Sequence, residues 1–167
     1  MYLNNHPYYS LRYGTFHEED LLKLAIENGV KTIVLTDINN TSACLNFIRL
    51  CTQSNLHAVI GIDFRNQHQQ LYVGIAKNNH GFQELNEYLS FHLENKIPFP
   101  DQAPAFENAF VIYPFKKVVS LEKTRFRESE FIGISIAALR KLPFTTYVKM
   151  KDKLVVMQTV TFRSRKD

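Results

Sequence analysis

The chain has 167 residues, of which 45% are hydrophobic and 22% charged, with a formal net charge of +4 and a pI near 9.0. This length is enough for one domain with one core, and no stretch reads as a transmembrane helix or a signal peptide. We therefore expect a soluble, cytoplasmic protein with no membrane partner. The mildly basic charge permits a nucleic-acid partner but does not require one.

Strands and helices are predicted to alternate from the N-terminus. The apolar runs are short and continuous, as in strands buried on both faces of a parallel sheet. After a first strand at "MYLNNH", the expected strands are 32–37 "TIVLTD", 57–63 "HAVIGID" and 71–77 "LYVGIAK". The expected helices are 18–28, 41–52 and 81–92.

Local signals define the first two helices. Thr15 and Glu18 have the spacing of a capping box, and Gly29 is expected to end the first helix. The second helix is predicted to bury one face, made of Ala43, Cys44, Phe47, Ile48 and Cys51. Because the two cysteines lie seven residues apart on that face, they are too far apart to form a disulfide, and we expect reduced core thiols.

The second half of the chain is less regular. A long loop rich in proline and polar residues follows the third helix, and a short helix is expected to start at Ser135. The expected strands are 109–115, 130–135 and 154–162. We assign residues 1–162 to a single domain, truncated from a larger chain, and residues 163–167 to a basic tail.

The order of elements predicts an α/β fold with right-handed parallel (βα) units. A closed barrel of such units usually needs ~250 residues, so we expect a distorted barrel that is incomplete in this fragment. The first strand or the last would then lie at an open edge, and an open edge predicts a homodimer or an exchange of elements.

Polar side chains gather where the predicted strands end, which is where parallel α/β folds carry their functional residues. Asn4 and His6 end the first strand, Asp37 ends the second and Asp63 ends the third. These residues are far apart in sequence but are expected to converge. The other histidines fall at helix starts, loops and a helix end, and we expect them at the surface: His17, His57, His68, His80 and His92.

The same stretches resemble the PHP (polymerase and histidinol phosphatase) domain family. "LNNHPYYSLRYG" is similar to its opening motif, an H-x-H followed by a serine and a glycine turn. "IVLTDINNTSACLNF" and "AVIGIDF" resemble the next two motifs. "LYVGIAKNNHGFQELNEYL" resembles one branch, the PHP domain at the N-terminus of the bacterial DNA polymerase III alpha subunit. The resemblance implies a PHP-type distorted barrel.

Several metal ligands of active family members are replaced in this sequence. The first histidine of H-x-H corresponds to Asn4, whereas the second is kept as His6. The aspartate after "LT" is kept as Asp37, but Ile38 stands where a histidine is expected. The glutamate of the third motif corresponds to Asp63.

The later ligand positions fall on Leu71, Phe115, Thr159 and Thr161. A catalytic zinc site needs about three protein ligands for each ion, and leucine or phenylalanine cannot supply one. The residues left are His6, Asp37 and Asp63. We expect no cofactor, or at most one weakly bound divalent metal. The same three residues could instead be a hydrogen-bonded rim histidine, a turn former and a strand-end cap.

The resemblance implies an N-terminal PHP-like domain of a replicative polymerase, with an eroded metal site, that supports the polymerase and offers a docking surface. The implied partners are the other polymerase domains, a proofreading exonuclease subunit and DNA bound through the parent protein. Two alternatives stay open. One is a residual metal-dependent phosphoesterase that uses His6, Asp37 and Asp63. The other is a basic nucleic-acid-binding module, for which the candidates are "RFR" (125–127) and "RSRK" (163–166).

Overall fold

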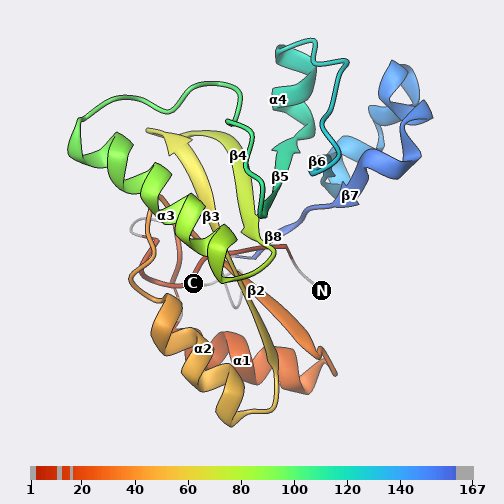
Figure 1. The fold of residues 1–167 in the computed structure, drawn as a ribbon. Helices are drawn as coiled ribbons and strands as arrows, with labels where there is room; N and C mark the ends of the chain where they lie inside the picture. The colour runs from red at the N-terminus through yellow and green to blue at the C-terminus, as the bar shows by residue number, and fades with distance from the viewer. Residues whose placement is uncertain (1–2, 11–12, 16, 161–167) are drawn as a thin grey trace.

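The computed structural model describes residues 3–10, 13–15 and 17–160, and it has a mixed α/β fold (Figure 1). The strands are β1 (Asn4–Asn5), β2 (Thr32–Ile38), β3 (His57–Asn66), β4 (Gln69–Ala76), β5 (Ala109–Pro114), β6 (Glu130–Ile134), β7 (Leu154–Val156) and β8 (Thr159–Val160). The α-helices are α1 (Glu18–Glu27), α2 (Cys44–Gln53), α3 (Asn79–Glu94), α4 (Phe115–Ser120) and α5 (Ile136–Leu139), and short 3₁₀ turns cover Leu142–Phe144, Thr146–Lys149 and Lys151–Lys153.

Six strands form one curled sheet in the order β2-β3-β4-β5-β6-β7. The pairs β2/β3, β5/β6 and β6/β7 are parallel as expected, but β4 runs antiparallel to both of its neighbours. A parallel crossover needs a dozen or more residues, and only Gln67 and His68 separate β3 from β4. Gln67 takes a positive φ of 54°, which lets the chain reverse there.

A second, two-stranded sheet lies beside the edge of the first. In it β1 runs parallel to β8, and β8 follows β7 after two residues. On its other side β1 reaches β2 through side chains, since Asn5 Nδ2 donates to the Val34 carbonyl at 2.6 Å. The first strand was one of the two candidates for an open edge, and it is paired instead. β7 is an edge strand of the large sheet. The predicted incomplete barrel is present as a curled sheet.

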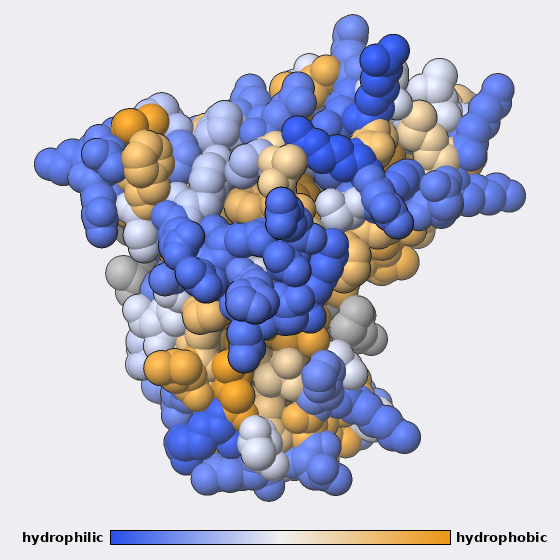
Figure 2. Space-filling model, viewed as in Figure 1, coloured by the Kyte–Doolittle hydropathy of each residue, from blue (hydrophilic) through white to orange (hydrophobic). Residues whose placement is uncertain are grey.

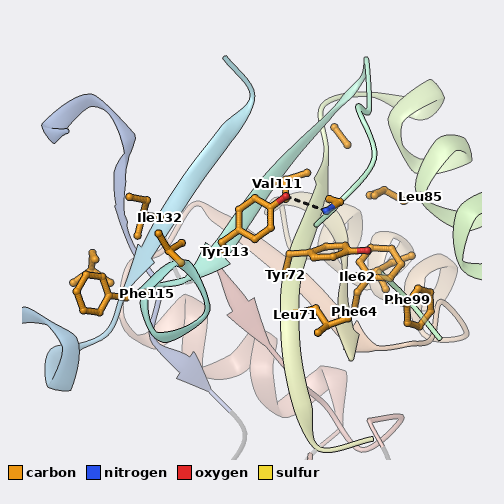
Figure 3. Close-up of a cluster of buried hydrophobic side chains, with 14 of the residues drawn as sticks. Ile62, Phe64, Leu71, Tyr72, Leu85, Phe99, Val111, Tyr113, Phe115 and Ile132 are labelled. Atoms are coloured by element: carbon orange, nitrogen blue, oxygen red, sulfur yellow. Dashed lines mark hydrogen bonds between the residues drawn. The ribbon is translucent and has the colours of Figure 1, made fainter. Parts of the chain in front are cut away.

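The core has three parts. Helix α3 and the loop after it cover the outer face of β3, β4 and β5, where Phe64, Tyr72 and Phe99 pack together and the Tyr113 hydroxyl accepts a hydrogen bond from Ala103 N at 3.0 Å (Figure 3). Helices α1 and α2 pack on β2. The third part fills the inside of the curl, with side chains from β2, β4 and β5 and from the β7–β8 connection: Val34, Val73, Ile75, Ile112 and Met157.

Most expected helices and strands are present, but some of them bury other residues than predicted. Phe47, Cys44 and Cys51 of α2 are buried as predicted, and both cysteines are free thiols. Ile48 was expected to be buried and is 41% exposed. Leu45 of the same helix is exposed as well. Apolar patches stand out over the region of α1 and α2 on a largely hydrophilic face (Figure 2). The helical register explains the exposure of Ile48, because Ile48 follows Phe47 by one residue and therefore points about 100° away from it.

Other differences arise from tertiary contacts. His92 was expected at the surface but is buried, because its ring packs between Tyr88 and Phe99. The N-cap of α1 is His17, which makes no side-chain capping bond. The short helix expected at Ser135 is present as α5, and the Ser135 side chain caps it. Helix α4 was not predicted. No helix within the described ranges has the length and apolarity to span a bilayer.

Candidate functional site

A polar cluster lies at the C-terminal end of the curled sheet, inside the curl. His6 follows β1, Asp63 and Arg65 lie near the end of β3, and Gln70 lies at the start of the antiparallel β4. The hairpin between β3 and β4 explains why a residue from the beginning of one strand meets residues from the end of the other. His6, Asp63 and Arg65 are all buried.

Asp63 is the centre of this cluster. Its Oδ2 lies 3.0 Å from His6 Nε2 and 2.8 Å from the Arg65 guanidinium, and it accepts a hydrogen bond from Gln70 Nε2 at 2.8 Å. The Arg65 guanidinium also lies 4.7 Å from the centroid of the Tyr13 ring. A buried carboxylate is tolerated when charged and hydrogen-bonding groups surround it. Arg65 supplies the positive charge here.

Two of the replaced ligand positions contact each other. Asn4 is fully buried, and its Nδ2 donates to Thr159 Oγ1 at 2.9 Å. Its Oδ1 accepts a hydrogen bond from Thr36 Oγ1 at 3.0 Å. Asn4 and Thr159 therefore join β1, β2 and β8 by neutral hydrogen bonds. Thr161 lies outside the described residues.

Asp37 lies apart from this cluster. Successive side chains of a strand point to opposite faces: Thr36 points to Asn4 inside the curl, whereas Asp37 contacts the Ser10 hydroxyl, which donates to Oδ1 at 2.5 Å. The same hydroxyl accepts a hydrogen bond from Ile38 N at 3.0 Å. The structure thus brings His6 and Asp63 together and places Asp37 on the outer face, where it anchors the loop that follows β1.

Burial raises the pKa of Asp37 to about 7, the Ser10 hydrogen bond opposes this rise, and the nearby charge of Glu18 adds to it. Burial, followed by the charge of Asp37, also raises the pKa of the Cys44 thiol to about 12. Cys44 is consequently a protonated core thiol rather than a nucleophile at neutral pH.

Asp37 should make stability depend on pH. Its folded pKa lies above the unfolded value of ~3.9, so its contribution is fully present below about pH 4 and is lost as the pH rises through about 7. Asp37→Asn keeps an acceptor for Ser10 without the charge. We compare the free energies of unfolding of the variant and the parent by urea unfolding at pH 5 and at pH 8. The difference in favour of the variant should grow by at least about 1 kcal/mol from pH 5 to pH 8. Equal changes with pH in both proteins would contradict this assignment.

The residues present fit a family-type metal site poorly. Leu71 and Phe115, at two expected ligand positions, are buried apolar side chains. The side of Asp63 that faces His6 is already in contact with the guanidinium of Arg65, which would repel a cation. Within the described residues, no three His, Cys, Asp or Glu side chains are grouped so that they could hold a metal ion.

Sequence reasoning missed Arg65 and Gln70. A signal for Arg65 was present, because it follows Asp63 by two residues in "GIDFRNQ", and residues two apart share a strand face. Gln70 had no such signal, since its contact depends on the antiparallel hairpin. The site therefore contains a cationic side chain that no metal-ligand motif would include.

Comparison with known proteins shows the family of this chain. The family model described as "PHP domain" matches residues 3–129. The chain belongs to the PHP domain family. This PHP domain has its polar cluster, built on Asp63, within the matched range.

Two curated relatives of this PHP domain are both DNA polymerase III subunit alpha. The protein from Ureaplasma parvum is 36% identical over 94 residues, and the one from Mycoplasma genitalium is 34% identical over 92 residues. These matches cover 56% and 52% of this chain but about 10% of each relative. A solved structure of a candidate metal-dependent phosphoesterase from Bifidobacterium adolescentis has a TM-score of 0.40 and 14% identity, with 56% of this chain and 34% of that chain covered.

Proposed function

We propose that this chain acts as a non-catalytic PHP domain of a DNA polymerase III alpha subunit. The observation that carries the proposal is the environment of Asp63, whose Oδ2 is in contact with His6, Arg65 and Gln70 together. An internal cation takes over the charge balance that a metal would otherwise provide. The polymerase relatives support the setting in DNA replication.

In this role the domain is a structural support and a docking surface. The remaining polymerase domains are its proposed first partner, since each relative is about ten times longer than the matched region. A proofreading exonuclease subunit is the proposed second partner, and DNA is reached through the parent protein. The cytoplasm is the compartment that such a role requires.

The proposal that this domain does not depend on a metal can be tested directly. We expect less than one zinc, manganese or iron atom per chain by elemental analysis of protein purified without a histidine tag. Adding EDTA should shift the melting temperature by less than about 1 °C, because no binding free energy is lost with the metal. Hydrolysis of p-nitrophenyl phosphate with added Mn²⁺ or Zn²⁺ should stay at background.

His6→Ala is the control for the hydrolysis measurement. Stoichiometric metal, together with hydrolysis that disappears in His6→Ala, would favour the residual phosphoesterase and overturn the proposal. Such an enzyme would have to work without Asp37, which lies on the other face of β2. Tight, salt-dependent binding of DNA by this chain would instead favour the nucleic-acid-binding module.

A further inference from the structure

The inside of the curl ends in an apolar hollow of about 610 Å³, at the end opposite the polar cluster. Its walls come from all six strands of the large sheet, β2 to β7, and they include Val34, Val59, Ile112, Phe131 and Val155. Lys77 supplies the single charged side chain among the residues that line it within the described chain. A volume of this size lies in the range of pockets that hold small molecules.

The rim of the hollow combines aromatic rings with lysines. Phe110 and Phe131 meet edge to face with centroids 5.8 Å apart, although Phe110 is 39% exposed. Lys77 Nζ lies 4.8 Å from the Phe110 ring, and Lys153 Nζ lies 5.4 Å from the Phe131 ring. Each ring at the opening thus has an ammonium group beside it. Lys77 Nζ also donates to the Glu107 carbonyl at 3.1 Å, whereas Lys153, outside the lining, donates to two backbone carbonyls.

We propose that the hollow binds an anionic amphiphile, a molecule with a hydrocarbon tail and a carboxylate or similar head. The walls favour the tail because burying each CH₂ group there removes apolar surface from water. Lys77, the charged side chain among the described lining residues, favours a negative head at the opening. A nucleobase fits less well, since its polar edges would find almost no hydrogen-bonding partners on these walls and would lose their water.

Decanoate is the probe for this proposal. We expect saturable one-to-one binding of decanoate at concentrations below those at which it forms micelles. The shifts of backbone amide NMR signals from residues around the hollow measure this binding. Octanoate, two CH₂ groups shorter, should bind about tenfold more weakly. Decanol and decyltrimethylammonium test the head, and the cationic probe should bind more weakly than decanoate.

Two kinds of variant distinguish the contribution of the hydrocarbon tail to binding from that of the negative head. Val155→Phe fills the hollow and should abolish decanoate binding, whereas Val156→Phe changes a neighbour that is 74% exposed and should leave it unchanged. Val59→Phe fills the hollow from β3 and replaces Val155→Phe if that variant melts at a lower temperature than the parent.

Lys77→Gln tests the head. This variant should weaken decanoate about threefold to fivefold, as expected for a partly exposed charge pair, and should leave decanol unchanged. Lys23→Gln, a change of an exposed lysine on α1, is the matched control. Absence of saturable decanoate binding would overturn the proposal. Binding that survives a folded, filled variant would overturn it too, as would a self-associated protein whose hollow is covered by a second copy.

Discussion

Arg65→Met should lower the free energy of unfolding by about 3 kcal/mol, near the lower end of the range for breaking a buried ion pair. The loss arises because the carboxyl group of Asp63, which is fully buried, loses the guanidinium at 2.8 Å. His6 and Gln70 still contact the carboxylate and limit the loss. Methionine preserves much of the side-chain volume, so the effect reports charge rather than packing.

Urea unfolding of Arg65→Met measures this loss, and Arg49→Met is the matched control. Arg49 lies on the exposed face of α2 and bonds only to neutral side chains of its own helix, Asn46 and Gln53, among the described contacts. Its replacement should cost no more than about 0.5 kcal/mol. Asp63→Asn combined with Arg65→Met should recover part of the stability, because no charge is left unpaired. An Arg65→Met loss as small as that of Arg49→Met would show that Asp63 does not depend on Arg65.

Phe47→Ala should cost about 3–5 kcal/mol, the usual range for a large-to-small change in a core. Phe47 has 0% exposure and lies where α2 packs on α1 and β2. The closely packed neighbours there can relax only partly into the space that the ring leaves.

Ile48→Ala, one residue along the same helix, provides the comparison. Ile48 is 41% exposed, so its replacement should cost less than about 1 kcal/mol. Both variants change the same helix by a similar substitution, and helix propensity therefore contributes little to the difference. Similar losses in the two would mean that α2 presents a different face to β2.

The sequence was sufficient to predict those strands and helices that a local pattern defines, such as a short apolar run or a helix cap. The runs at 32–37 and 57–63 became β2 and β3, and Ser135 became a helix cap. It also placed Asn4, His6 and Asp63 at strand ends that meet. Family resemblance extended this to the curled sheet, because the order of the motifs carries the topology.

What the sequence could not supply depends on pairing between distant segments. The antiparallel direction of β4 follows from the two-residue connection between β3 and β4. Gln70 reaches Asp63 only because of that hairpin. Asp37 does not lie with His6 and Asp63, because successive side chains of β2 point to opposite faces. His92 became buried through the long loop that brings Phe99 onto α3.

The pairing of β1 with β8 joins Asn4 to Thr159, two residues separated by nearly the whole described chain. Of the described strands, β1 is synthesised first, and its backbone partner β8 is synthesised last. Before β8 is made, the side chains of Asn4 and Asn5 can bond to β2, at Thr36 and at the Val34 carbonyl. Contacts of such long sequence separation slow folding, so β2 to β6 can assemble early while β1 stays exposed to chaperones and proteases.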